Sequence, residues 1–262
     1  MKRTLLALSL CAALTACAPQ VVRQQPAPEP TPDPLPKPAS PQARAKARTD
    51  LGFAYYGDAQ FKIAIEEARK ALEADSNYAP AHHLLALIHV YLKEFSTAQM
   101  HFEQAVRFDP RDPAINNAYG LFLCTQGRGK EGIERLMIAA RDPLYPNPSY
   151  PYTNAGMCSL WINDDKAAEE YLRRAVIADD QNTQAVYLLA LVNYRQKKLD
   201  EAKRLVDEVI GRGEPNAESV WLALRVERKL GNREAEAGYA SQLRRKFKNS
   251  PEYKSLVQGQ FE

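Results

Sequence analysis

Four cysteines are the residues of this chain best suited to covalent chemistry: Cys11, Cys17, Cys124 and Cys158. A thiol can be acylated, can pair as a disulfide or can hold a metal ion, and its surroundings decide which of these applies. Cys11 lies inside an apolar N-terminal run, and Cys17 follows that run directly. Cys124 and Cys158 stand far from them, 34 positions apart. The N-terminal and C-terminal pairs therefore need separate explanations.

The context of Cys17 is that of a lipidation site. Lys2 and Arg3 precede an apolar run from Leu5 to Leu14, which is too short for a permanent membrane span but typical of a secretory signal. Leu14-Thr15-Ala16-Cys17 has the residue types and order of a bacterial lipobox. This predicts a signal peptide at residues 1–16 and attachment of diacylglycerol to the Cys17 sulfur. The alternative is a plain signal peptide that contains a cysteine. Ala18, rather than Asp, favours the outer membrane as the destination.

Residues 17–43 form a proline-rich segment between this anchor and the rest of the chain. Every second residue from Pro26 to Pro38 is proline. Proline lacks the backbone donor that a helix needs and disfavours helical geometry in the residue before it. We therefore expect an extended linker that works as a tether.

Residues 44–250 repeat with a period near 34, which is the length of the tetratricopeptide repeat, or TPR, a pair of antiparallel helices. The six units begin at Ala45, Ala79, Pro113, Ser149, Thr183 and Ala217. Small residues recur at positions 8 and 20, where paired helices approach closely, and large residues recur at positions 7, 11 and 24, where they fill the space between units. The sequence predicts an all-α superhelical solenoid, with the sixth unit as a cap because Glu236 replaces a small residue there. Residues 251–262 are left as a C-terminal tail.

Three motifs that resemble catalytic or metal sites are explained better by this repeat. The G-x-G-x-x-G spelling of Gly127–Gly132 falls at the turn between two helices, whereas a dinucleotide site needs a strand before it. The paired acids Asp164-Asp165 and Asp179-Asp180 fall at turns, where they would cap helices. The histidines lack carboxylate or cysteine partners at metal-binding spacing and are expected in or near the core. These histidines are His82, His83, His89 and His101. We expect no catalytic residue, cofactor or metal.

The charge balance gives no reason to expect nucleic acid. Removal of the signal takes away Lys2 and Arg3 and no acidic residue, so the formal net charge falls from +3 to +1. The last unit is locally basic, and its cations are Arg225, Arg228, Lys229, Arg244, Arg245, Lys246 and Lys248. A solvated face is the simpler interpretation, with an acidic partner or lipid headgroups as the alternatives.

The binding surface of such a solenoid is expected on its concave side, at positions 2, 5, 9 and 12 of each first helix. Most of these positions carry apolar or aromatic residues, which suit an extended or helical peptide. The alternative is that some of them pack against neighbouring units. The expected groove residues are Phe53, Tyr56, His83, Leu87, Val90, Asn117, Leu121, Thr153, Met157, Leu160, Tyr187, Leu191, Tyr194 and Trp221.

Cys124 is at position 12 of the first helix of the third unit, and Cys158 is at position 10 of the first helix of the fourth unit. The two positions differ because the third unit is two residues longer than the repeat period. Because the two cysteines lie on neighbouring helices in an oxidising compartment, a disulfide between Cys124 and Cys158 is favoured. The alternative is two packed, unpaired thiols.

The chain also resembles the PilF/PilW family of type IV pilus biogenesis lipoproteins. The likeness covers the lipobox, the six units and three local stretches: 116–123, Asp142-Pro143-Leu144-Tyr145-Pro146, and Ser250-Pro251-Glu252-Tyr253. The long proline-rich linker departs from the family.

The resemblance implies a lipoprotein of the outer membrane that faces the periplasm and is held there by lipid on Cys17. It would bind a secretin subunit, or another pilus-assembly protein, and assist secretin localisation and assembly. One alternative is an adaptor on the same fold for polysaccharide export or outer-membrane protein assembly. Another is an enzyme with a helical-repeat body, which would need a polar constellation in the groove that the sequence does not contain.

Overall fold

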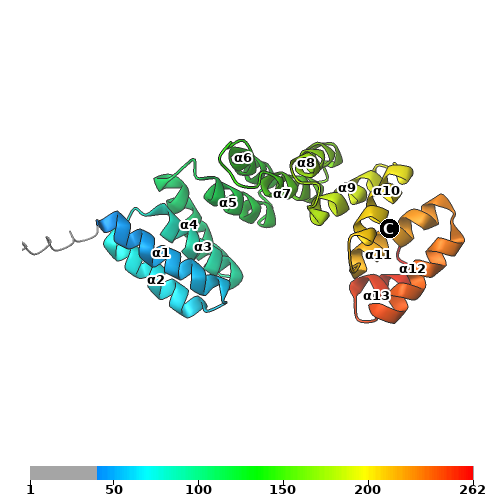
Figure 1. Cartoon of the computed structure of the whole chain (residues 1–262), viewed down its shortest axis with the longest axis horizontal. Coiled ribbons are helices and arrows are strands. Elements are labelled where there is room, and N and C mark those ends of the chain that lie inside the picture. Colours follow the sequence, from blue (N-terminus) through cyan, green and yellow to red (C-terminus); the bar gives the residue numbers. More distant parts are fainter. Residues whose placement is uncertain (1–39, 262) are drawn as a thin grey trace, which may run out of the picture. The chain divides into compact units, whose positions relative to one another are not determined.

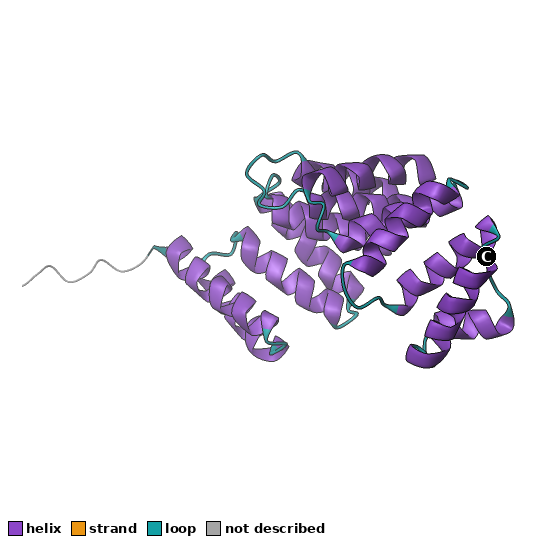
Figure 2. Ribbon diagram, turned by 45° about the vertical axis from the view of Figure 1, so that its right-hand side comes forward, coloured by secondary structure: helices purple, strands orange, loops and turns teal. Residues whose placement is uncertain are grey.

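The computed structural model describes residues 40–261, and all regular secondary structure in that range is α-helix (Figure 2). Cys11, Cys17, the predicted signal peptide and most of the predicted linker lie outside the described residues. Within 40–261, no helix has the length and apolar composition that crossing a bilayer requires.

Helix pairs follow one another in chain order, and each pair packs on the next (Figure 1). The first helices of the six units are α1 (Pro41–Gly57), α3 (Ala79–Tyr91), α5 (Pro113–Thr125), α7 (Ser149–Trp161), α9 (Thr183–Arg195) and α11 (Ala217–Leu230). The second helices are α2 (Phe61–Ala74), α4 (Phe95–Phe108), α6 (Gly129–Ala140), α8 (Asp165–Ala178), α10 (Leu199–Gly211) and α12 (Arg233–Lys246). A thirteenth helix, α13 (Pro251–Gln258), follows the last pair. The TPR solenoid predicted from the sequence is therefore confirmed.

Side-chain caps explain why several first helices begin where the repeat predicts. The side chain of Asp112 accepts a hydrogen bond from the backbone N–H of Ile115 at 2.8 Å, which fixes the start of α5 at Pro113. Asn182 and Asn216 cap α9 and α11 in the same way. Each cap satisfies a backbone donor that a helix start leaves unpaired, and is worth about 1 kcal/mol.

The small residues at positions 8 and 20 allow the two helices of a unit to touch. In the third unit, a Cβ added to Gly120 would lie 2.7 Å from the carbonyl oxygen of Gly132. A Cβ added to Gly132 would lie 2.6 Å from the carbonyl oxygen of Gly120. Real Cβ atoms do not approach backbone this closely, so α5 and α6 need glycine at both positions.

Successive units share buried side chains, which is how the repeats form one core. Phe102 on α4 stacks on Tyr119 of α5 with ring centroids 5.1 Å apart, and Phe122 of α5 lies 5.3 Å from Phe102. No single unit encloses these rings, so stacking of neighbours supplies the burial.

Both ends of the solenoid differ from the predicted boundaries. Helix α1 begins at Pro41, inside the segment assigned to the linker, because Ser40 caps it and proline is tolerated at a first helical position. The tail assigned to 251–262 contains α13, which Ser250 caps through the backbone N–H of Tyr253.

Helix α13 completes the cap of the last unit. Among the residues of α12, Leu243 alone is buried, so that helix has a largely exposed outer face. Tyr253, Leu256 and Phe261 pack against the cluster that Leu243 and Trp221 share. The segment after the sixth unit therefore covers apolar surface that a further repeat would otherwise cover.

Candidate functional site

The first helices lie side by side, since α1 contacts α3, α3 contacts α5, α5 contacts α7, α7 contacts α9, and α9 contacts α11. Their concave positions consequently form one continuous surface, which we call the concave surface. At its N-terminal end Phe53, Tyr56, Leu87 and Val90 are half-buried. Each of them contributes to the core with one side and stays accessible on the other.

Aromatic rings surround this N-terminal end. The ring of Phe53 meets His83 edge to face at 5.8 Å, and Tyr56 meets Phe61 in the same manner at 5.8 Å. Phe61 in turn lies 4.2 Å from Tyr91, which is 63% exposed. Rings held in this way present rigid apolar area at little cost in conformational entropy, as binding anchors require.

Four of the expected groove residues are buried and cannot contact a ligand. His83 is 8% exposed and Thr153 is 2% exposed. Thr153 donates a hydrogen bond to the Ser149 carbonyl at 2.8 Å and accepts one from Asn182 at 3.1 Å, so its polar group is used inside the fold. Leu160 and Trp221 are buried as well. Positions 5 and 12 turn toward the neighbouring unit at these points, which the repeat numbering does not reveal.

The middle of the concave surface is less apolar. Leu121 and Met157 are half-buried there, and the Asn154 side chain donates a hydrogen bond to the Asn117 side-chain oxygen at 3.0 Å. That bond links α5 to α7 across two units and leaves Asn117 partly accessible.

The C-terminal end combines rings with cations. Tyr187, Leu191 and Tyr194 of α9 are half-buried, and burial raises the pKa of Tyr187 to about 12. The guanidinium of Arg225 on α11 lies 4.9 Å from the centre of the Tyr194 ring. Beside them is a hollow of about 530 Å³, large enough for one or two side chains of a ligand.

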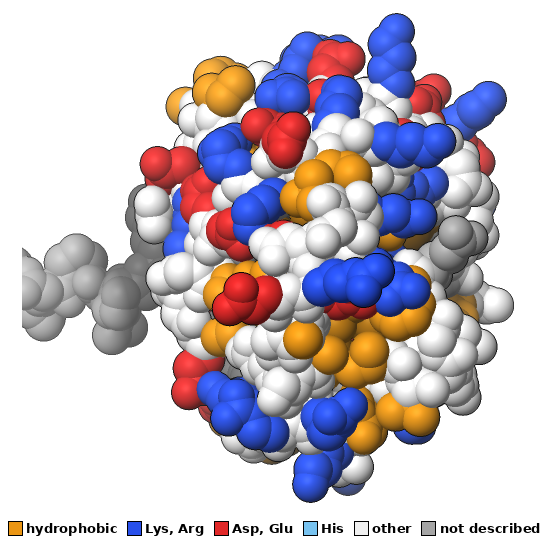
Figure 3. Space-filling view, turned by 90° about the vertical axis from the view of Figure 1, so that its right-hand side faces the viewer, with side chains coloured by type: hydrophobic (Ala, Val, Ile, Leu, Met, Phe, Trp, Pro, Cys, Tyr) orange, Lys and Arg blue, Asp and Glu red, His pale blue; other side chains and the backbone are white. Residues whose placement is uncertain are grey.

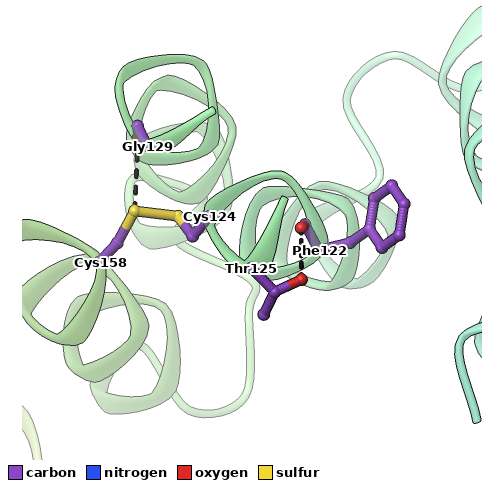
Figure 4. The surroundings of a disulfide bond; sticks show 5 residues. All are labelled: Phe122, Cys124, Thr125, Gly129 and Cys158. Atoms are coloured by element: carbon purple, nitrogen blue, oxygen red, sulfur yellow. Dashed lines mark hydrogen bonds between the residues drawn. A yellow bond between two sulfur atoms is a disulfide. The ribbon is translucent and has the colours of Figure 1, made fainter. Parts of the chain in front are cut away.

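A disulfide joins Cys124 on α5 to Cys158 on α7, with the two Cα atoms 5.5 Å apart (Figure 4). The Cys158 sulfur also lies 3.4 Å from the carbonyl oxygen of Gly129 at the start of α6. Both cysteines are buried. The bond therefore ties the third unit to the fourth beneath the middle of the concave surface.

Comparison with known proteins agrees with this architecture. Family models of the tetratricopeptide repeat match residues 79–112 and 165–217. The type IV pilus assembly protein PilF of Pseudomonas aeruginosa is 30% identical over 210 residues, which are 80% of this chain and 83% of that protein. The chain belongs to the PilF/PilW family of type IV pilus biogenesis proteins.

Two solved structures of the family have the same arrangement. The structure of Pseudomonas aeruginosa PilF superposes with a TM-score of 0.76 at 29% identity and covers 84% of this chain and 99% of that one. The structure of PilW, a type IV pilus biogenesis factor, gives 0.76 at 30% identity and covers 81% and 98%. The PilF/PilW resemblance inferred from the sequence is confirmed.

In this PilF/PilW protein the remaining motifs have structural roles. Gly127 has a φ of +78° in the turn between α5 and α6, a backbone conformation that glycine adopts without strain. Asp164 caps α8 through the backbone N–H of Ala167. The other acids form turn and ion-pair contacts, such as Asp165 with Arg195.

Three of the four histidines of the second unit, His82, His89 and His101, face one another between α3 and α4. The Nδ1 atoms of His82 and His101 are 3.1 Å apart, and the ring of His89 stacks on that of His101. Burial lowers the pKa of His101 to about 4, so the ring is neutral near pH 7. Within residues 40–261, no three His, Cys, Asp or Glu side chains are arranged to hold a metal ion.

Arg225 and Arg228 are concave-surface residues that the sequence prediction missed. They occupy positions 9 and 12 of the sixth unit, the positions that Leu191 and Tyr194 occupy in the fifth. The repeat numbering alone was a sufficient signal. The expected groove residues include apolar, aromatic and polar side chains at these positions but no Lys or Arg.

Proposed function

We propose that this protein is a lipid-anchored scaffold of the outer membrane, facing the periplasm, that binds secretin subunits and assists their localisation and assembly for the type IV pilus. The observation that carries the proposal is the concave surface, whose N-terminal end presents Phe53, Tyr56, Leu87 and Val90 as accessible apolar side chains. A surface of this kind fits an apolar peptide segment of a client.

The mechanism is binding combined with anchoring. Acylation of Cys17 would place the solenoid at the membrane, and a client held by a tethered scaffold has a raised local concentration there. One acyl chain holds a protein only marginally, whereas two or three hold it firmly. This mechanism requires no catalytic group of the scaffold.

The first test is capture of the secretin. The full protein is isolated from detergent-solubilised envelope and the co-purifying proteins are identified by mass spectrometry. We expect a secretin subunit to co-purify. Capture of polysaccharide-export or outer-membrane assembly components, without a secretin, would contradict the proposal.

The second test concerns the anchor. We expect Cys17→Ser to abolish acylation and to release the protein into the soluble periplasmic fraction. Recovery of this variant in outer membranes without a bound partner would contradict lipid anchoring.

A further inference from the structure

Arg225 on α11 has a buried donor without an acceptor. Its guanidinium lies 4.9 Å from the Tyr194 ring centre and 5.7 Å from that of Trp221. Its Nε is buried and has no hydrogen-bond partner within residues 40–261. Leaving a charged donor unpaired in a buried place costs free energy, and an acceptor that enters from outside would recover it.

Further cations line the same hollow. Lys197 and Lys229 make no ion pair with any residue of the described range. Arg195, by contrast, is paired with Asp165 at 3.0 Å. No carboxylate of residues 40–261 lines the hollow, so within this range three positive charges face it without compensation.

The hollow also has an apolar side. Leu191 and Leu199 line it together with the ring of Tyr194. Figure 3 views the C-terminal side of the molecule and shows Lys and Arg side chains gathered around apolar ones on that face. An apolar floor next to unpaired cations suits a ligand that carries both an apolar side chain and a negative charge.

The adjoining hollow holds an aromatic ring of the chain itself next to a cation, which is an example of the packing expected for such a ligand. It shares Tyr194, Arg225 and Lys229 with the first hollow and is lined in addition by Phe261. The Phe261 ring stacks on Trp221 at 5.5 Å, and the Arg228 guanidinium lies 3.9 Å from its centre. An aromatic ring between an indole and a guanidinium is a favourable arrangement.

We propose that the cationic pocket, formed by Leu191, Tyr194, Lys197, Leu199, Arg225 and Lys229, binds an acidic peptide segment of a protein partner. A carboxylate of the peptide pairs with Arg225 and Lys229, and a neighbouring apolar side chain packs on Leu191 and Leu199. The planar guanidinium of arginine matches a carboxylate in two parallel hydrogen bonds.

This inference rests on the proposed function and deepens it, because the pocket is the C-terminal end of the same concave surface. A client that lies along the surface would place apolar residues at Leu87 and Val90 and acidic residues at the pocket. A peptide fits this place better than a membrane, since Arg225 is half-buried within a concavity and a bilayer surface contacts exposed, convex cations.

The test uses fluorescence anisotropy with the full protein and two labelled peptides. The first peptide has acidic residues on both sides of one phenylalanine. In the second, every Asp is Asn and every Glu is Gln. We expect the amide peptide to bind at least roughly tenfold more weakly, because it lacks the charge-assisted bonds.

Two variants locate the binding, and a third is the control. We expect Arg225→Gln and Lys229→Gln each to weaken binding of the acidic peptide roughly fivefold to tenfold. Lys229 is exposed, so its replacement leaves the fold intact even where loss of Arg225 packing does not. Arg204→Gln removes an exposed cation of α10 that is already paired with Glu201, and we expect no change.

Glu262 follows Phe261 and lies outside the described residues. The experiment is therefore repeated with Glu262→Gln, which removes a carboxylate of the chain itself. The preference for the acidic over the amide peptide is expected to persist.

Three outcomes would overturn the inference. They are equal binding of the two peptides, equal loss in the Arg204→Gln control, and Arg225-dependent binding of phosphatidylglycerol vesicles instead of the peptide. The proposed function is tested separately, by capture of the secretin with the unaltered protein, and none of these three outcomes would contradict it. Conversely, Leu87→Glu with Val90→Glu is expected to weaken that capture strongly and to leave binding of the acidic peptide unchanged.

Discussion

At the N-terminal end of the concave surface, positions 9 and 12 of the second unit carry Leu87 and Val90, whereas the same positions of the sixth unit carry Arg225 and Arg228. Both pairs stand on first helices with the same place in the repeat. The backbone therefore offers equivalent positions at the two ends, and the side chains alone make one end apolar and the other cationic. A scaffold of this type can hold two chemically different parts of one client.

The difference predicts different responses to salt. Apolar contacts at Leu87 and Val90 depend weakly on ionic strength, while the attraction of the cationic pocket for an approaching acidic segment is screened beyond about 8 Å at physiological salt. The C-terminal end would then guide the encounter and the N-terminal end would supply most of the affinity.

The largest expected change in stability concerns the disulfide in the middle of the solenoid, between the N-terminal and C-terminal ends of the concave surface. The disulfide of Cys124 and Cys158 closes a loop across 34 positions in the sequence, so Cys124→Ala with Cys158→Ala should lower the free energy of unfolding by about 4 kcal/mol. Urea denaturation of the periplasmically produced protein measures it, and reduction of the unaltered protein should give a similar loss. Alkylation before reduction, followed by mass spectrometry, should find neither thiol modified; two alkylated thiols would refute the bridge.

The next effect concerns the apolar end. Leu87→Glu with Val90→Glu places two charges on accessible apolar surface and should weaken secretin binding by about 3 kcal/mol, or roughly a hundredfold. Ile177→Glu is the matched control, because Ile177 lies on α8 and is 85% exposed. Unchanged capture by the double variant, with its helical circular dichroism intact, would mean that the client binds elsewhere.

The two ends should also differ in how their stability depends on pH. Burial lowers the pKa of His83 from its ordinary value of 6.5 to about 4, whereas Trp221 at the same repeat position does not titrate. The unfolded chain therefore binds a proton that the folded chain excludes, and stability falls as the pH drops below 6.5 until about 4. Between pH 7 and pH 5 we expect a loss of about 2 kcal/mol from this group.

Urea unfolding at the two pH values measures this loss, and His83→Gln should show a smaller one because glutamine has no proton to gain. An equal pH dependence in the variant would assign the effect to other groups, such as His101, whose pKa burial also lowers to about 4.

The smallest effect concerns the helix that carries Arg225. Asn216 caps α11 by accepting a hydrogen bond from the backbone N–H of Ser219 at 2.9 Å, so Asn216→Ala should cost about 1 kcal/mol of stability. Glu214→Ala in the same loop removes no cap and should change stability by less than about 0.5 kcal/mol. Equal losses in the two variants would show that the cap contributes nothing specific.

Much of the fold could be predicted from the sequence, because the residue types in each repeat indicate where its two helices pack together. Glycine or alanine at position 8 and at position 20, as in Gly120 and Gly132, indicates two helices in contact wherever the chain places them. Five of the six first helices begin at the residue that the repeat predicts. The exception is α1, which Ser40 caps at Pro41, and beyond the last unit Ser250 caps the additional helix α13.

The site could be predicted only in part. Phe53, Tyr56, Leu87 and Val90 are accessible as expected, but His83, Thr153, Leu160 and Trp221 are not. Position within a unit tells which way a side chain leaves its own helix. It does not tell whether the rotation of the next unit covers that side chain.

The sequence by itself determined the helical repeat and the family, because these depend on residue types at fixed spacing and on contacts within a unit or between adjacent ones. The tertiary structure alone decided the rest. It brought Cys124 and Cys158 to a Cα separation of 5.5 Å and set Arg225 of the sixth unit over Tyr194 of the fifth. Such contacts depend on the rotation between units, and a shift of one helix diameter or less creates or removes them without any change in the repeat pattern.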